Sequence, residues 1–203
     1  HLMKKFISTI QNIWRIEELR NRILNTLLFL AIFRLGTFLV LPGIDAEELA
    51  KSAAKSEGGI LGLINTFAGG AFLRGSVFAL GIMPYISASI VIQLLTLALP
   101  SFQRLQKEGE EGRRKMNQYT RLLTIAITAV QSIGYLASLK SDSRAAIWGL
   151  DVMGNFGWTM TSIILITAGT MFILWLGEKI TADVKNTVYA HVLKQSPTFF
   201  ETT

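Results

Sequence analysis

The stretch "GGILGLINTFAGGAFLRGSVFALGIMPYISASIVIQLL", residues 58–95, decides the fold of this chain. Its first apolar piece, residues 60–73, has no charged residue and is followed by Arg74-Gly75 and a second, longer apolar piece. A straight helix over residues 60–73 would reach only ~21 Å, against ~30 Å for the hydrocarbon core of a bilayer. The second piece is long enough to span. The stretch therefore predicts one interrupted membrane helix, with a half-length helix in front of a span.

The distribution of charge identifies the class of protein. Half of the 203 residues are hydrophobic, a fraction that soluble proteins also approach, and the mean hydropathy is +0.41. Arg34 is the only charge within four long apolar runs, and these predict spans over residues 23–41, 76–99, 122–139 and 152–177. The sequence thus predicts an all-α integral membrane protein with about four transmembrane helices and a short re-entrant helix.

Basic residues alternate between the predicted loops and so indicate an orientation. Five Lys and Arg precede residue 23 and six lie in the 101–121 loop, but only two lie in each of the 43–59 and 140–151 loops. The positive-inside rule then places the N-terminus and the 101–121 loop in the cytosol. The need to keep this loop in the cytosol is enough to explain its basic residues. The alternative is that they contact ribosomal RNA or anionic lipid. The short helix of residues 60–73 enters from the opposite side.

The two ends of the chain lie outside the predicted spans. The start "HLMKK" places two residues ahead of Met3 and predicts a cloning remnant. Residues 6–22 predict an amphipathic helix at the membrane interface, with a solvated helix packed on another subunit as the alternative. Residues 182–203 predict a polar tail. The chain has no cysteine, and its two histidines, His1 and His191, lie too far apart in the sequence to predict a metal site.

No arrangement of residues points to catalysis. The sequence contains no paired-histidine metal motif, phosphate-binding loop or nucleophile elbow, so it predicts neither an enzyme nor a cofactor. Arg34 is a functional candidate because an ionisable residue inside a span is costly. We favour a structural role for it, in which the side chain reaches an interface or bonds backbone carbonyls of a neighbouring helix; the alternative is a direct role in transport.

The interruption itself predicts a cavity. The free backbone ends of a half-length helix need protein or water around them, and broken helices are typical of channels and transporters. Pro84 is expected to kink the second piece, and Ile82 and Ile86 share a helix face. A hairpin that only fills space between spans is the alternative. A small-solute transporter would need polar or charged groups at the break, where this chain has Ile, Phe, Ala and Gly.

Several long motifs closely resemble the SecY family, the pore subunits of the bacterial Sec protein-conducting channel. The motifs occur in the family's order and at its spacing, and the resemblance covers about residues 4–181. They are "RLGTFLVLPGID" (34–45), "FAGGAFLRGSVFALGIMPYISASIVIQLL" (67–95), "KEGEEGRRKMNQYTR" (107–121), "QSIGY" (131–135) and "WLGEKIT" (175–181).

The resemblance implies a fold and a set of site residues. The family forms a clamshell of ten transmembrane helices in two halves around an hourglass pore, and residues 23–181 are similar to the first half. Residues 60–73 match the plug, Ile82 and Ile86 the apolar pore ring, and Ser87, Ile90 and Gln131 the lateral gate. The plug residues that we single out are Ile60, Leu61, Ile64, Phe67, Gly69, Gly70 and Phe72.

The two plug glycines predict a short helix of low stability. Gly69 and Gly70 are expected to weaken the short helix by roughly 1 kcal/mol each relative to alanine. A weakened helix would suit an element that must move out of a pore. The alternative is that these glycines only allow close contact between helices.

The resemblance also implies a function and partners. A protein of this family passes unfolded precursors across the membrane and signal or transmembrane segments into it. The implied partners are SecE-type and SecG-type subunits, the SecA motor ATPase or a ribosome, signal-bearing precursors and the lipid bilayer of the bacterial inner membrane. After residue 181 the chain departs from the family's pattern, so the resemblance implies that the second half of the channel must be supplied.

Overall fold

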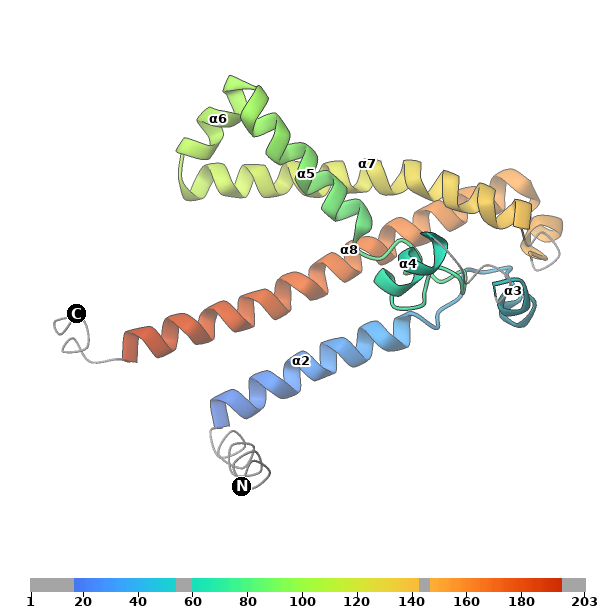
Figure 1. Cartoon of the computed structure of the whole chain (residues 1–203), viewed down its shortest axis with the longest axis horizontal. Coiled ribbons are helices and arrows are strands. Elements are labelled where there is room, and N and C mark those ends of the chain that lie inside the picture. The colour runs from blue at the N-terminus through green and yellow to red at the C-terminus, as the bar shows by residue number, and fades with distance from the viewer. Residues whose placement is uncertain (1–16, 54–59, 143–146, 195–203) are drawn as a thin grey trace. The chain divides into compact units, whose positions relative to one another are not determined.

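The computed structural model describes residues 17–53, 60–142 and 147–194 (Figure 1). This part of the chain is α-helical, which confirms the predicted class. Its helices are α2 (Glu17–Gly36), α3 (Ala46–Ala53), α4 (Ile60–Phe67), α5 (Met83–Ala98), α6 (Pro100–Lys107), α7 (Glu110–Asp142) and α8 (Gly149–Lys194). The chain divides into two compact units, one of residues 34–174 and one of residues 1–33 with 175–203.

Two described helices, α7 and α8, are long and apolar enough to cross a membrane. The bent pair α5 and α6 passes the same test as a third candidate. The chain is therefore an integral membrane protein, although length and composition give two or three spans in the described residues rather than about four. Helix α2 is the remaining predicted span, and its 20 residues include Arg20, Arg22 and Arg34 as well as two glutamates.

The unit formed by both ends of the chain contains α2 up to residue 33 and α8 from residue 175. Within it, the Arg22 guanidinium donates to the carbonyl of Asp183. Residues 17–22 belong to the same helix as the predicted first span, so no helix boundary occurs at residue 22. Most of the predicted interfacial helix lies outside the described residues. The predicted tail is helical as far as Lys194.

Two of the predicted spans are cut short at one end in the structure. Helix α2 ends at Gly36 rather than near residue 41, and the chain turns there, with the Thr37 hydroxyl donating to the Arg34 carbonyl over 2.6 Å. Helix α5 begins at Met83 rather than at Ser76. Pro84 is its second residue, where no backbone N–H is needed, so this proline starts the helix instead of kinking it.

The predicted 101–121 loop is helical in the structure. The chain bends by 100° between α5 and α6, and α6 then connects to α7, so that α5, α6 and α7 form three sides of a triangle (Figure 1). Ion pairs support this hairpin: Lys115 lies 3.5 Å from Glu108 and 3.7 Å from Glu111, and Arg113 lies 3.8 Å from Glu110. Helix α7 is about 50 Å long, so its polar first turns extend well beyond the ~30 Å of a bilayer core.

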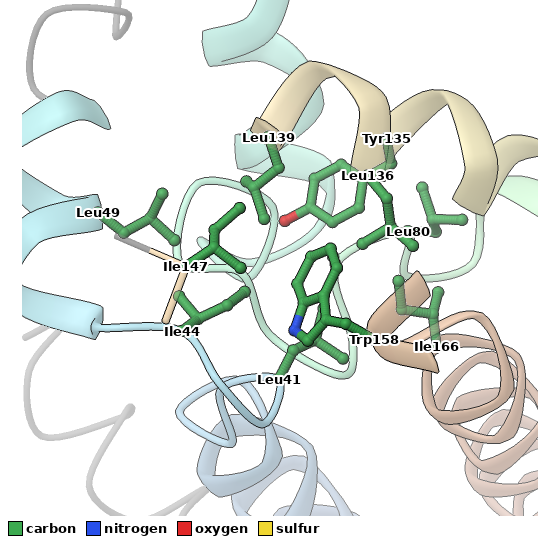
Figure 2. Close-up of a cluster of buried hydrophobic side chains, with 11 residues drawn as sticks. Leu41, Ile44, Leu49, Leu80, Tyr135, Leu136, Leu139, Ile147, Trp158 and Ile166 are labelled. Carbon is green, nitrogen blue, oxygen red and sulfur yellow. The ribbon is translucent and has the colours of Figure 1, made fainter. Parts of the chain in front are cut away.

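A cluster of buried side chains holds the larger unit together (Figure 2). Trp158 is fully buried within it and donates its indole N–H to the Pro42 carbonyl over 2.9 Å. Beside it, the Gly149 N–H donates to the Gly43 carbonyl over 2.9 Å, and this close approach leaves no room for a side chain. The cluster comprises Leu41, Ile44, Leu49, Ala79, Leu80, Tyr135, Leu136, Leu139, Ile147, Trp158 and Ile166.

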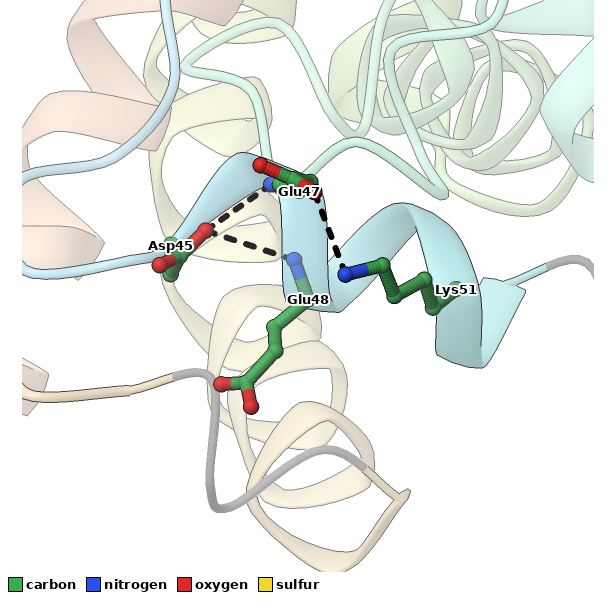
Figure 3. Close-up of polar contacts among 4 residues, drawn as sticks. All are labelled: Asp45, Glu47, Glu48 and Lys51. Atoms are coloured by element: carbon green, nitrogen blue, oxygen red, sulfur yellow. Dashed lines mark hydrogen bonds and ion pairs between the residues drawn. The ribbon is translucent and has the colours of Figure 1, made fainter.

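Helix α3 lies directly after this packed segment and begins with a capping residue (Figure 3). One carboxylate oxygen of Asp45 accepts from the N–H groups of Glu47 and Glu48, over 2.9 and 3.3 Å. These bonds satisfy two of the N–H groups that a helix start leaves free. Lys51 and Glu47 form an exposed ion pair of 3.1 Å one turn apart.

Candidate functional site

The interruption in the membrane helix runs over residues 68–82, so it is wider than the predicted break at Arg74-Gly75. Its backbone pairs with the segment that follows α2. The Leu41 N–H donates to the Gly75 carbonyl over 2.8 Å, and the Val77 N–H donates to the Leu39 carbonyl over 2.9 Å. The Ser76 hydroxyl donates to the Gly36 carbonyl and accepts from the Phe78 N–H. Protein groups therefore satisfy much of the backbone that the break would otherwise leave free.

The short helix α4 ends in a glycine cap. The Gly70 N–H donates to the Asn65 carbonyl over 2.8 Å and the Gly69 N–H donates to the Thr66 carbonyl over 3.1 Å, which is the bonding pattern of a Schellman motif. Gly69 and Gly70 have φ of 63° and 85°, a conformation that favours glycine. The expectation that they weaken the middle of this helix is wrong, because the helix stops at Phe67 and they form its C-terminal cap.

The body of α4 presents apolar side chains to its surroundings. Leu63 is 63% exposed and Phe67 is 74% exposed, while Ile64 is half-buried. Ile60 and Leu61 lie in the first turn of this helix, and their side chains are outside the described part of the chain. The last predicted plug residue, Phe72, lies beyond the helix, in the interruption, and is half-buried.

Two side chains from long helices bind the backbone just after α4. The Arg34 guanidinium, in the last turn of α2, donates to the Gly69 carbonyl over 2.8 Å. The Tyr135 hydroxyl, on α7, donates to the Phe72 carbonyl over 2.7 Å, and the two aromatic rings lie 4.9 Å apart. This contact fits the favoured structural role of Arg34, in which it bonds a backbone carbonyl, although the carbonyl lies in the interruption rather than in a helix. The role itself stays a prediction.

A second arginine lies close to the first. The guanidinium of Arg74 lies 4.5 Å from the centre of the Phe38 ring, and that of Arg34 lies 5.4 Å from the same ring. Nη1 of Arg74 is buried and has no hydrogen-bond partner. Two cations thus lie over one aromatic ring at the interruption, and of these two arginines Arg34 is the one that bonds the cap of α4.

The predicted pore-ring residues lie on an unpacked face at the start of α5, with Ile82 as the N-cap residue and Ile86 within the helix. Ile82 is 39% exposed and Ile86 is 44% exposed; the Ile86 N–H donates to the Ile82 carbonyl over 3.1 Å, which confirms that they share a face. The same stripe continues to Ile90, which is 51% exposed. The opposite face is buried where α5 packs with α7 and consists of Pro84, Ala88, Ile92 and Thr96.

The predicted lateral-gate residues come from both of these packed helices. Ser87 and Ile90 lie on α5 and Gln131 lies on α7. Ser87 is half-buried and donates its hydroxyl to the Met83 carbonyl one turn earlier, over 3.1 Å. Gln131 is half-buried beside a buried polar stripe of α7, whose members Thr120, Thr124, Thr128 and Ser132 each donate to the carbonyl four residues earlier. The gate assignment stays a prediction.

Sequence reasoning missed three contributors to this site. Tyr135 lies within the quoted motif "QSIGY" but was not singled out, and a tyrosine hydroxyl in an apolar span signals a need for a partner. Asn65 accepts the Leu73 N–H at its side-chain oxygen over 3.1 Å, which closes the turn after α4. Phe38 carries no polar atom, so no signal in the sequence identified it as the ring between two arginines.

Comparison with known proteins identifies the family. The SecY family model matches residues 76–184, which is more than half of the chain. The chain belongs to the SecY family. This membership confirms the resemblance, and it does not favour a small-solute transporter.

Three relatives illustrate the similarity. The protein translocase subunit SecY of Escherichia coli strain K12 is 47% identical over 164 residues, covering 81% of this chain and 37% of the relative. That of Buchnera aphidicola subsp. Schizaphis graminum is 47% identical over 165 residues, with the same two shares. That of Streptomyces galbus is 41% identical over 174 residues, covering 83% of this chain and 40% of the relative. The chain therefore spans less than half the length of these SecY proteins.

Proposed function

We propose that this chain forms part of the wall of a protein-conducting channel. In this role it contributes one side of the pore through which unfolded precursors cross the membrane and signal or transmembrane segments enter it. The chain itself carries out no catalysis. The observation that carries the proposal is an exposed isoleucine stripe directly after the interruption. It consists of Ile82, the N-cap residue of α5, with Ile86 and Ile90 on that helix.

The chemistry of that stripe suits a pore that accepts any polypeptide. Branched aliphatic side chains can close around a moving chain without binding any one of its side chains. An apolar constriction also excludes hydrated ions, because it tends to lose its water. In this proposal Ile82 and Ile86 form part of the pore ring.

The short helix α4 acts as the plug of this channel. Its apolar body, with Leu63 and Phe67 exposed, can cover an apolar pore. A single hydrogen bond from α2 holds its cap at Gly69, and one from α7 holds Phe72 beyond the cap. Ser87 and Ile90 on α5, with Gln131 on α7, form one wall of the lateral gate. A seam between this wall and the opposing helices of the channel would let an apolar signal segment reach lipid.

The proposed assembly extends beyond this chain. The relatives are named subunits of a protein translocase, and the chain covers 37% to 40% of the three described above. We propose that the remaining channel wall, SecE-type and SecG-type subunits and a SecA motor or translating ribosome complete it. The setting is the bacterial inner membrane, with the N-terminus and the α6–α7 hairpin in the cytosol, as the basic residues of both segments favour.

Complementation tests this function. Residues 17–181 would replace the matching part of the E. coli relative, and the chimera would be expressed in cells depleted of their own channel subunit. Restored secretion of a signal-bearing precursor is expected. A chimera that is present in the membrane with its partner subunits but restores no secretion would contradict the proposal.

A further inference from the structure

We propose that Arg34 is a latch that holds the short helix α4 in its closed position. Breaking the bond from Arg34 to Gly69 would free α4 to swing about Gly69 and Gly70. The inference rests on the proposed function, in which α4 is the plug, and it adds the residue that holds the plug and the point about which it turns.

The contact lies where a helix attracts a cation. The last carbonyls of a helix have no partner within it, and the helix dipole places partial negative charge at that end. Arg34 donates to Gly69, the residue that caps this end of α4, over 2.8 Å. The bond is made to a backbone carbonyl, so it holds α4 whatever side chains the plug carries.

The latch is exposed, whereas the contact beyond it is part-buried. Arg34 and Gly69 make an exposed hydrogen bond, which water can replace when it opens. By contrast, Tyr135 is 6% exposed and both bonds and packs against Phe72. The segment at Phe72 is therefore anchored, and the cap at Gly69 is the weaker of the two contacts.

The two glycines between these contacts allow a pivot. Both have positive φ, and a side chain built at Gly70 would meet no atom within 4 Å. Rotation there would move α4 relative to the anchored Phe72, and it would also have to break the 3.1 Å bond that the Leu73 N–H donates to the side-chain oxygen of Asn65 on α4. The exposed side chains Leu63 and Phe67 leave the outer face of α4 without packing to oppose that movement within the described part of the chain.

Arg74 provides a matched control for Arg34. Both guanidiniums lie over the Phe38 ring, at 4.5 and 5.4 Å, so replacing either with methionine removes one cation from the same cluster. Only Arg34 donates to Gly69. A comparison of the two variants therefore separates the loss of the latch bond from the loss of positive charge.

Hydrogen exchange measures the latch directly. The full-length chimera, assembled with its partner subunits in nanodiscs, would be compared with its Arg34→Met, Arg34→Lys and Arg74→Met variants. Arg34→Met should speed exchange of the Gly69 and Gly70 amides about tenfold, the size expected for one charge-assisted hydrogen bond. Arg34→Lys should restore part of the protection, and Arg74→Met should leave these two amides unchanged. Unchanged exchange in Arg34→Met, or an equal increase in Arg74→Met, would overturn the proposal.

Transport measurements connect the latch to gating. In the Arg34→Met channel, export of a precursor with a defective signal and ion conductance at rest should both rise relative to Arg74→Met.

If the unmodified chimera exports nothing, the proposed function fails, but the exchange experiment still decides the latch. If the chimera exports normally and exchange at Gly69 and Gly70 is the same in all variants, the latch alone fails. Arg34→Leu, which also removes the donor at this position, replaces Arg34→Met if that variant does not assemble.

Discussion

Three side chains define the geometry around the interruption by donating to distant backbone carbonyls. Arg34 bonds Gly69, Tyr135 bonds Phe72 and Trp158 bonds Pro42, over separations of 35, 63 and 116 residues. Each donor comes from a helix, and each acceptor lies in a segment between helices. The irregular segments are thus held by groups on regular elements, as backbone inside a membrane protein requires.

The sequence could identify the donors better than the acceptors. An arginine or tyrosine inside an apolar helix signals a need for a partner, and Arg34 was recognised for this reason. Its partner is a backbone carbonyl, and every residue has one, so no residue type points to Gly69. The face shared by Ile82 and Ile86 could be predicted, because it depends only on a spacing of four within one helix.

Removing the Tyr135 hydroxyl tests the anchor at this scale. Tyr135→Phe keeps the ring packed against Phe72 but leaves the Phe72 carbonyl without its partner. The unfolding free energy should fall by about 1 kcal/mol, measured by denaturant titration in micelles. Tyr119→Phe is the matched control, because that side chain is 47% exposed and its hydroxyl can bond water; an equal loss in both variants would contradict the anchor.

A polar substitution in the isoleucine stripe tests the pore ring. Ile86→Asn places an amide that retains water in a constriction that is proposed to be dry. Ion conductance of the reconstituted full-length chimera at rest should rise at least about tenfold, measured across a planar bilayer. Val91→Asn, on another face of α5 and 39% exposed, should not raise it. Equal conductance in both variants would show that Ile86 does not line the pore.

At the scale of elements, the sequence predicted which apolar stretches form helices better than where those helices begin and end. Local signals explain the differences. Pro84 suggested a kink, but the chain is already irregular up to Ile82 and the proline lies in the first turn of α5. The 101–121 segment is polar and so suggested a loop, yet charge pairs between helical neighbours support the start of α7.

The contact between the start of α8 and the segment before α3 provides a test at this scale. A side chain at Gly149 would lie 2.6 Å from the Trp158 ring and 2.9 Å from Cα of Gly43, distances too short without movement. Gly149→Ala should lower the unfolding free energy by about 1–3 kcal/mol, again by denaturant titration. Gly134→Ala, in α7 with no atom within 4 Å of the new side chain, should raise it by up to about 1 kcal/mol. Stabilisation by Gly149→Ala would show that the close approach of the two glycines is not needed.

At the scale of the whole molecule, the apolar helices and the family match lead to the same conclusion from different observations. The charge-free runs predicted a membrane protein, and the family model covers residues 76–184, the part that contains α5, α6, α7 and most of α8. What composition could not predict is that an apolar face of α5 stays exposed in this chain. An exposed apolar stripe is typical of a surface that meets lipid, another protein or a pore, and the family favours the pore.

A reversible lock on the short helix tests the central claim, that α4 must leave the pore for transport. A side chain at Gly81 would place its Cβ 3.8 Å from Cβ of Ala68, within the range for a disulfide, and this chain has no other cysteine. Export of a signal-bearing precursor would be measured for the Ala68→Cys/Gly81→Cys chimera, in an E. coli channel whose own cysteines are replaced, before and after a reductant. Each single cysteine variant would serve as a control. Export should stop when the disulfide forms and return on reduction. Export at the unlocked rate through channels shown to be fully cross-linked would contradict the role of α4 as a plug.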